Sequence, residues 1–156
     1  MIENDPHIWY IYVLMPEKLN ILLVDDNSEH LTLTQYLLKR NAVPGEVYVV
    51  RDGQDAIDFL YRRNQFSDPA TNPRPNLILL DFNIPRVDGR EVLRRLKEDK
   101  VLKDIPIVVL SSSDLQEDIA YAKQLGASAY ISKSAGFEKL SEELASVHKF
   151  ASHTTS

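Results

Sequence analysis

Five polar residues stand directly after short apolar runs of this sequence and could carry out chemistry together. They are a pair of carboxylates, a third carboxylate, a hydroxyl and an ammonium, namely Asp25, Asp26, Asp81, Ser111 and Lys133. Three carboxylates that lie close together repel one another, and their ionised forms persist only beside a cation. If the fold brings these residues together, we expect a site for a divalent metal ion and for a phosphoryl group, which needs the same charge neutralisation.

The ligand preferences of Mg²⁺ suggest which residues would hold the metal. Mg²⁺ takes a small number of carboxylates, keeps several waters and accepts a phosphate oxygen. Asp26, Asp81 and the backbone carbonyl of Asn83 are therefore the expected ligands, and Asp25 is expected to hold a coordinated water.

The same reasoning makes Asp81 the nucleophile that takes the phosphoryl group. Lys133 is suited to pair with one phosphate oxygen as a compact charge, and the Ser111 hydroxyl could donate to another. An acyl phosphate at Asp81 would add about −1.5 to −2 charge at one point. Such a change suits the input of a switch and not a metabolic product.

Each of these features alone has an ordinary structural explanation. An acidic pair after a strand is more often a helix cap in a solvated turn, and Asp81 could be a turn residue ahead of Pro85. Residues 111–114 would make a good helix N-cap cluster without any chemistry, and Lys133 is by default an exposed lysine. Their joint occurrence at four of five expected strand ends favours the functional interpretation.

From Leu19 onward, short apolar runs alternate with amphipathic stretches, which is typical of a parallel sheet covered by helices. Asn27 or Ser28 is the expected N-cap of the first helix, and residues 63–74 are expected to form an exposed loop. The pattern predicts strands at 20–24, 46–50, 77–80, 105–110 and 129–132, and helices at 29–39, 54–62, 89–98, 115–125 and 137–150. The predicted fold is therefore α/β, a doubly wound parallel (βα)₅ sheet.

In such a sheet, ligands bind outside the carboxyl ends of the strands, near the point where the winding direction reverses. The five polar residues named above stand at those ends. We therefore expect them to converge on one rim of the sheet.

The composition restricts the class of protein further. With 156 residues, 44% of them hydrophobic, the chain has the size and the apolar material of one globular domain. The formal net charge of −5 offers no basic surface, so we expect no direct nucleic-acid binding. The absence of cysteine excludes thiolate metal sites and favours a cytoplasmic location. The histidines show no zinc spacing and are expected at the surface: His7, His30, His148 and His153.

The two ends of the chain do not follow the alternating pattern. Residues 1–18 are an N-terminal extension of uncertain role: an upstream start, an added strand, a patch that covers a neighbour or a poorly ordered terminus. Its apolar run at 8–15 is far shorter than the roughly 20 residues of a membrane helix, so no membrane contact is expected. The folded domain is expected at 19–150, followed by a polar tail at 151–156 and no output domain.

Four motifs resemble the response-regulator receiver domain of two-component signalling, over about residues 19–150. They are LVDDN at 23–27, LLDFNIPRVDG at 79–89, IVVLSSS at 107–113 and GASAYISK at 126–133. The resemblance implies a flavodoxin-like sheet of strand order 2-1-3-4-5, and phosphorylation of Asp81 by a sensor histidine kinase with Mg²⁺ or Mn²⁺. It also implies that Ser111 is the switch hydroxyl, Tyr130 the aromatic that turns inward on activation, and Lys133 the invariant lysine.

The sequence departs from the family pattern after Lys133. Receivers usually have proline there, whereas this chain continues with Ser134, Ala135 and Gly136. The geometry of the loop is therefore left open. Asn83 and Ser113 fall at variable positions that tune loss of the phosphoryl group in the family, and their effect here cannot be predicted from identity.

The proline-containing loop at 63–74 and the segment from Lys133 to Phe137 resemble phytochrome-associated response regulators, which are small stand-alone receivers. This resemblance implies a phytochrome-type histidine kinase as partner. In such regulators the fourth and fifth elements often form a homodimer. Four aromatic residues are candidates for that face, although core packing explains some equally well: Tyr121, Tyr130, Phe137 and Phe150.

Three other functions could use similar residues. A metal-dependent phosphohydrolase with an aspartyl nucleophile normally has a second acid two residues later, where this chain has Asn83. A nucleotide-binding domain would need a glycine-rich phosphate loop, which the five glycines do not form. An interaction module that has lost phosphorylation would be expected to lack a site residue, and all are retained. We therefore expect a signalling switch and not an enzyme.

Overall fold

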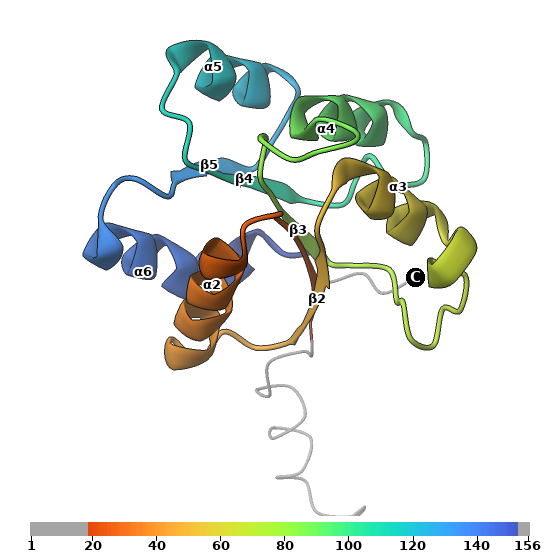
Figure 1. The fold of residues 1–156 in the computed structure, drawn as a ribbon, viewed down its shortest axis with the longest axis horizontal. Coiled ribbons are helices and arrows are strands. Elements are labelled where there is room, and N and C mark those ends of the chain that lie inside the picture. Colours follow the sequence, from red (N-terminus) through yellow and green to blue (C-terminus); the bar gives the residue numbers. More distant parts are fainter. Residues whose placement is uncertain (1–18, 153–156) are drawn as a thin grey trace, which may run out of the picture.

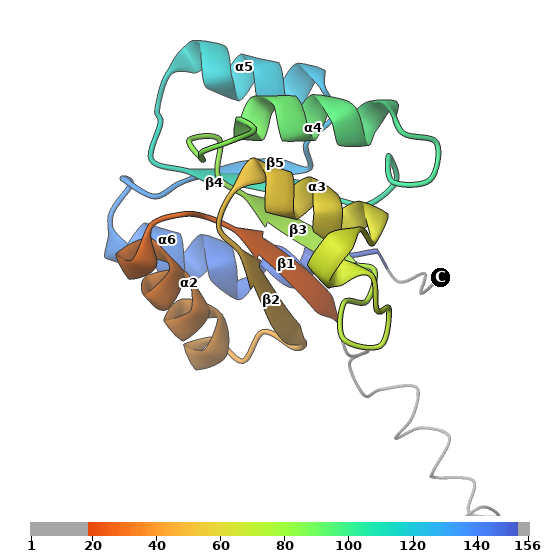
Figure 2. The same ribbon diagram turned by 45° about the vertical axis from the view of Figure 1, so that its right-hand side comes forward.

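The computed structural model describes residues 19–152. Within this range, five parallel strands form one sheet (Figure 1, Figure 2). Its strand order, β2-β1-β3-β4-β5, confirms the predicted flavodoxin-like order, with the winding direction reversing between β1 and β3. The strands are β1 (Asn20–Val24), β2 (Glu46–Val50), β3 (Leu77–Leu80), β4 (Ile107–Ser111) and β5 (Ala129–Ser132).

Helices cover both faces of this sheet (Figure 1). One face carries α2 (Ser28–Arg40) and α6 (Phe137–Ala145), which lie side by side. The opposite face carries α3 (Gly53–Tyr61), α4 (Gly89–Glu98) and α5 (Gln116–Gln124). Two short 3₁₀ turns, η2 (Asn64–Phe66) and η3 (Val147–Phe150), follow α3 and α6.

The central strands are almost entirely apolar because both of their faces are covered, and only Asn20 and Ser111, at strand ends, are polar. In β3, Leu77 and Leu79 belong to the core shared with α2 and α6, while Ile78 and Leu80 belong to the core shared with α3, α4 and α5. All four side chains are fully buried. Burial of one such side chain contributes roughly 1.5–3 kcal/mol. The position of β3 is therefore strongly stabilised, and with it the position of Asp81, which follows its last residue.

Polar side chains determine where several helices begin. Asn27 is the N-cap of α2, as one of the two expected caps, and its Oδ1 atom accepts a hydrogen bond from the backbone N–H of His30 at 3.0 Å. Asp88 caps α4 in the same way through the N–H of Arg90 at 2.8 Å. These caps satisfy N–H groups that have no partner within the helix.

Residues 111–114, for which a helix N-cap was the alternative explanation, do not cap α5. That helix begins after Leu115, which has no side-chain cap bond. The carboxylate of Asp114 instead accepts hydrogen bonds from Ser132 and Ser134, and the hydroxyl of Ser113 donates to Asp118 inside α5. These side chains join loops to one another, which a local capping rule does not predict.

The folded structure continues past residue 150. The expected helix at 137–150 ends at Ala145 and resumes as η3, after which Ala151 is buried. The backbone N–H of Ser152 donates to the carbonyl of Asn76 at 3.0 Å. Residues 1–18 and 153–156, and hence the expected extension and most of the expected tail, lie outside the described residues. No helix within residues 19–152 has the length and apolar character needed to span a bilayer.

Candidate functional site

The pairing of β1 with β3 brings two of the expected site residues to one edge of the sheet. Val24 lies opposite Leu80 in this pair, and the backbone N–H of Asp81 donates to the carbonyl of Val24 at 3.0 Å. Asp25 and Asp81 therefore follow neighbouring strand ends. Parallel strands place both carboxylates on the same rim, as the sequence predicts.

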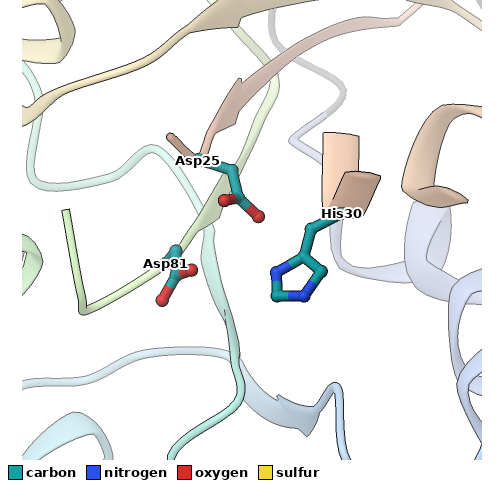
Figure 3. Close-up of side chains that lie close together, drawn as sticks. All are labelled: Asp25, His30 and Asp81. Atoms are coloured by element: carbon teal, nitrogen blue, oxygen red, sulfur yellow. The ribbon is translucent and has the colours of Figure 1, made fainter. Parts of the chain in front are cut away.

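Lys133 reaches this rim from the end of β5. Its backbone N–H donates to the carbonyl of Ser111 at 2.9 Å. Its ammonium donates to Oδ2 of Asp81 at 2.8 Å and to Oδ2 of Asp25. The nitrogen also lies 3.2 Å from Nδ1 of His30, and Figure 3 shows Asp25, Asp81 and His30 gathered at this point.

This cluster is shielded from water. Asp25 is 1% exposed, Asp81 is 5% exposed, and the side chain of Lys133 is 6% exposed. Two buried carboxylates beside each other are unfavourable unless a cation and hydrogen bonds compensate their charge. The ammonium of Lys133 provides that compensation in this structure.

The second oxygen of each carboxylate holds the loop that follows it. Oδ1 of Asp25 accepts from the backbone N–H of Asn27, and Oδ1 of Asp81 accepts from the backbone N–H of Asn83, both at 3.0 Å. Such bonds, from a residue to the N–H two positions later, form Asx turns. The carboxylates are thus held in place from both sides.

Burial separates the two adjacent carboxylates, and two histidines that were expected at the surface are half-buried. Asp26, an expected metal ligand, is exposed, whereas Asp25 is buried beside Asp81. His30, expected at the surface, is half-buried in the first turn of α2 and takes part in the site; His148 is also half-buried. The signal for His30 was its position five residues after Asp25, since the first helical turn after β1 remains above the rim.

The donor set fits a hard divalent ion. Among residues 19–152, ligand atoms of Asp25, His30 and Asp81 lie within 4.8 Å of one another. Carboxylate oxygens are the preferred ligands of Mg²⁺ and Mn²⁺, and each carboxylate oxygen has lone pairs beyond the one used by a single hydrogen bond. The residues present can therefore hold such an ion at the carboxyl edge of the sheet.

The expected switch residues, Ser111 and Tyr130, lie close together at the next strand ends. Ser111 is fully buried, and its Oγ accepts from the backbone N–H of Ser113 at 3.2 Å. The hydroxyl of Tyr130 donates to the carbonyl of the same Ser113 at 2.5 Å. The Tyr130 ring meets Phe82 edge-on, with 6.1 Å between centroids, and burial raises the pKa of Tyr130. Ser113 thus connects the hydroxyl to the aromatic ring.

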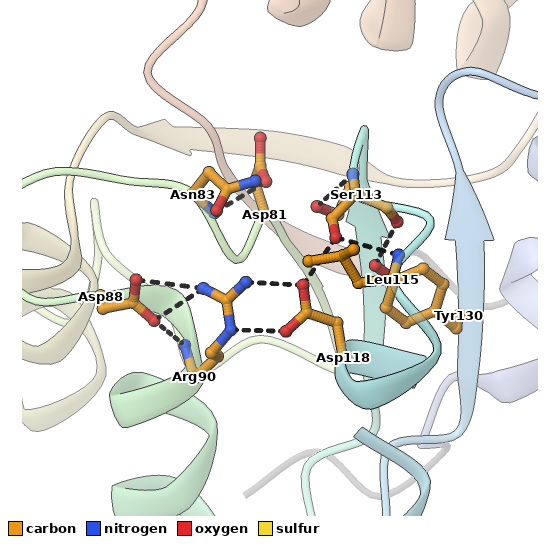
Figure 4. Close-up of polar contacts among 9 residues, drawn as sticks. Asp81, Asn83, Asp88, Arg90, Ser113, Leu115, Asp118 and Tyr130 are labelled. Carbon is orange, nitrogen blue, oxygen red and sulfur yellow. Dashed lines mark hydrogen bonds and ion pairs between the residues drawn. The ribbon is translucent and has the colours of Figure 1, made fainter. Parts of the chain in front are cut away.

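A second polar cluster, absent from the sequence prediction, joins α4 to α5 (Figure 4). The guanidinium of Arg90 donates to both oxygens of Asp118, at 2.8 and 2.7 Å, and Ser113 donates to Asp118 at 2.6 Å. Arg90 also lies over the ring of Phe82, 4.9 Å from its centroid. We call these contacts of Arg90, Asp118 and Ser113 the Arg90–Asp118 network. It links the loop after Asp81 to the loop that carries Ser113.

The hydrogen bonds of this network shift the pKa values of its ions. The bond from Arg90 holds the pKa of Asp118 below its usual value, with a further contribution from Ser113, while burial opposes the shift. The pKa of Arg90 is raised, chiefly by its bond to Asp118. Both groups are therefore charged at neutral pH, and the ion pair is intact there.

A glycine allows α4 to begin close to the loop that follows Asp81. A Cβ atom at Gly89 would lie 2.2 Å from the carbonyl oxygen of Asp81 and 2.6 Å from Cα of Phe82. Both neighbours are backbone atoms and cannot move aside individually. The close approach places Arg90 within reach of Phe82 and Asp118.

The loop after Lys133 has ordinary peptide geometry. The bond between Lys133 and Ser134 is trans, as are all the peptide bonds that the structure describes. The hydroxyls of Ser132 and Ser134 donate to Asp114 at 2.5 and 2.6 Å. These bonds tie the loop after β5 to the loop after β4.

A doubly wound (βα)₅ sheet with buried carboxylates, a lysine and a hydroxyl at its carboxyl edge has the features of a two-component receiver. The protein-family model of the response regulator receiver domain matches residues 21–145 of this chain. The chain belongs to this family, whose members act as signalling proteins.

The relatives of this chain include a phytochrome response regulator. Over 130 residues the chain is 38% identical to response regulator Rcp1 of Synechocystis sp., covering 83% of this chain and 86% of Rcp1. The crystal structure of the phosphorylated cyanobacterial phytochrome response regulator RcpA is similar, with a TM-score of 0.76, 41% identity, and coverage of 86% of this chain and 94% of RcpA. The Mn²⁺-bound form of Rcp1 also has a TM-score of 0.76, with 37% identity and coverage of 85% and 93%.

Proposed function

We propose that this protein is a response regulator whose Asp81 accepts a phosphoryl group from a sensor histidine kinase. The observation that carries the proposal is the buried ammonium of Lys133 between the carboxylates of Asp25 and Asp81. Such an arrangement sets a positive charge beside Asp81, where a phosphoryl oxygen would arrive. The structures of phosphorylated RcpA and Mn²⁺-bound Rcp1 support it by similarity.

The residues of the site would divide the work of the transfer. An oxygen of Asp81 attacks phosphorus, so that an O–P bond forms while the P–N bond to the kinase histidine breaks. Lys133 exchanges its bond with Asp81 for one to a phosphoryl oxygen, and the hydroxyl of Ser111 donates to another. Tyr130 would then change position with Ser113, because its hydroxyl donates to the carbonyl of that residue. The result would be a shift between two pre-existing states.

The metal would be Mg²⁺ or Mn²⁺, held by Asp25, Asp26, Asp81 and the backbone carbonyl of Asn83. When bound, it supplies positive charge to the phosphoryl oxygens during transfer. Asp26, although exposed, directly follows the buried Asp25. A hard ion at this point could therefore use solvent waters together with protein oxygens.

The partner we propose is a phytochrome-type histidine kinase. The support is similarity to Rcp1 and to RcpA, whose structure is described as that of a phytochrome response regulator. The formal net charge of −5 is unfavourable for direct contact with nucleic acid. Readout by another protein or by a second copy of the chain fits this charge.

The phosphoacceptor is tested with a small-molecule phosphodonor, Mg²⁺ and intact-mass measurement. Wild type is expected to gain one phosphoryl group, and Asp81→Asn none, because an amide is not a nucleophile for this transfer. A chelator should abolish the adduct of the wild type. A matched control is Asp88→Asn, since Asp88 lies on the same loop but caps α4. If wild type stays unmodified while another receiver accepts the group, the chain is a phosphorylation-independent interaction module and the proposal fails.

Phosphorylation is also expected to favour a homodimer through α5, β5 and α6. Of the four candidate aromatics, Phe137 is 49% exposed, whereas Tyr121, Tyr130 and Phe150 pack partly on the two cores. Light scattering should give the mass of two chains after phosphorylation, and Phe137→Ser should reduce that mass toward one chain. Val101→Ser, at a position 66% exposed elsewhere, is the control. A one-chain mass in both states would contradict the dimer.

A further inference from the structure

His30 is a part of the site for which the family motifs provide no role. It stands in the first turn of α2, where its backbone N–H is bonded to the cap Asn27 at 3.0 Å. Its side chain is directed toward the two carboxylates (Figure 3), and Nδ1 lies 3.2 Å from the Lys133 nitrogen. The Asn27 cap holds the first turn of α2 in place, and this turn holds the imidazole ring of His30 above the carboxyl edge of the sheet.

The ammonium of Lys133 has as many acceptors as it has protons. An ammonium donates three hydrogen bonds and accepts none. Its neighbours here are Oδ2 of Asp25, Oδ2 of Asp81 and Nδ1 of His30. An ammonium can only donate, so in a hydrogen bond between Lys133 and His30 the Nδ1 atom is the acceptor.

The three acceptors differ in what phosphorylation does to them. Asp81 is the proposed acceptor of the phosphoryl group, and Asp25 is a proposed metal ligand. His30 lies on α2 and has neither of these roles, so its contact with Lys133 is the one of the three that the proposed transfer would leave unchanged. The side chain of a lysine is flexible and its ammonium is strongly hydrated. A fixed acceptor such as His30 therefore limits the positions that the Lys133 ammonium can take.

We propose that His30 is a positioning residue that holds the Lys133 ammonium in place while its bond to Asp81 is exchanged for one to a phosphoryl oxygen. The inference rests on the proposed function of Asp81. Lys133 provides the charge that meets the phosphoryl group, and His30 acts through it. The contribution is orientational, because His30 would act only by fixing the position of the ammonium.

The test compares a variant without the acceptor to one that keeps it. His30→Leu removes Nδ1, whereas the side chain of asparagine carries an acceptor atom at the same number of bonds from the backbone. The rate of phosphoryl adduct formation should fall about tenfold in His30→Leu and return to within about twofold of wild type in His30→Asn. His30 is half-buried at the start of a helix, so both variants are expected to fold, which thermal melting would check.

Other outcomes would overturn the proposal. If the rate of adduct formation fell equally in both variants, the volume of the ring would matter and not its acceptor atom. If the rate were unchanged in both, His30 would have no role in the transfer. A fall in Mn²⁺ affinity in His30→Leu but not in adduct rate at saturating Mn²⁺ would make His30 a metal ligand instead. In a Lys133→Met background, His30→Leu should have no further effect on the rate, and an additive loss would show that His30 does not act through Lys133.

A separate measurement keeps this inference distinct from the proposed function. In protein labelled with ¹⁵N in its imidazoles, Nδ1 of His30 should resonate as an unprotonated, hydrogen-bonded nitrogen, and its resonance should shift in Lys133→Met. If wild type gained no phosphoryl group but this contact were present, the proposed function would fail while the geometry stood. If the resonance were unaffected by Lys133→Met, the contact itself would be absent and the positioning role would be lost.

Discussion

Replacing Lys133 with methionine is expected to lower the free energy of unfolding by about 3 kcal/mol in metal-free buffer. The change leaves the carboxylates of Asp25 and Asp81, which are 1% and 5% exposed, without the ammonium that now lies between them. Removal of one partner from a buried ion pair costs more than the pair contributed, because the remaining charge is buried without compensation. Methionine has a similar length and an unbranched stem, so lost packing contributes little.

Chemical denaturation with and without Mg²⁺ measures this effect. Binding of Mg²⁺ to the folded state of Lys133→Met should restore much of the lost stability, since a ligand that binds only the folded state stabilises it by mass action. Lys139→Met is the matched control: its side chain is 65% exposed and lies 4.0 Å from Glu143, and exposed ion pairs of this kind contribute about 0–1 kcal/mol. Equal stability of Lys133→Met and wild type without metal would contradict the assignment of Lys133 as the resident counter-ion.

Replacing Asp118 with asparagine is expected to cost about 2 kcal/mol at neutral pH. Asp118 is 5% exposed and accepts two bonds from Arg90 and one from Ser113. An amide can accept at one oxygen only, so Arg90 loses one of its two bonds and one of its N–H groups would face the amide NH₂. We place the cost below that of a fully buried pair because the side chain of Arg90 is 30% exposed.

The pH dependence of this cost has a definite sign. The folded-state pKa of Asp118 lies below its ordinary value of 3.8, chiefly because of its bond from Arg90. A depressed carboxyl pKa contributes stability that is complete above the ordinary value and is lost as the pH falls toward the folded-state value. The difference in unfolding free energy between wild type and Asp118→Asn should therefore be constant from about pH 6 to 8 and shrink below about pH 4.

Urea denaturation across this pH range tests the prediction. Glu117→Gln, one residue earlier on α5 and exposed, is the control and should change stability by no more than about 0.5 kcal/mol. The ring resonances of Tyr130 should also shift in Asp118→Asn, because its hydroxyl is bonded to Ser113. If the stability difference persisted undiminished below about pH 4, the carboxylate of Asp118 would not be the group responsible.

The Arg90–Asp118 network indicates how a change at Asp81 would reach α5. Phe82 follows Asp81 directly and contacts both Arg90 and Tyr130. Arg90 holds Asp118 on α5, which in turn accepts from Ser113. A shift of the loop after β3 would therefore move charged and aromatic contacts that end on α5 and β5. These are the elements for which we propose a dimer contact.

The sequence by itself determined the fold and the five strands, although β4 runs from Ile107 to Ser111 and not over the predicted 105–110. The predicted bounds 20–24 and 77–80 match β1 and β3, because the interior of a strand covered on both faces is apolar. The predicted positions of helix ends were less accurate where a cap was inferred from neighbouring residues alone. The cap at Asn27 was found because its partner is three residues away, whereas Asp114 bonds to Ser132 and Ser134 across the site.

For the candidate site, the sequence identified the residues that parallel pairing alone brings together. Asp25, Asp81, Ser111 and Lys133 stand at or directly after strand ends, so the register of the sheet places them on one rim. Their assigned roles follow from charge and ligand chemistry and stay predictions until the variants are measured.

Only the tertiary structure decided which of these groups touch. The spacing did not indicate that Asp25 and not Asp26 would be buried, or that Arg90 would pair with Asp118 across two helices. It placed His30 near the rim, but only the packing of α2 brings its ring to Lys133. The physical reason is that these contacts depend on the height and rotation of α2, α4 and α5 above the sheet. Packing of their apolar faces sets that placement, and close approaches such as that of Gly89 to the Asp81 carbonyl permit it.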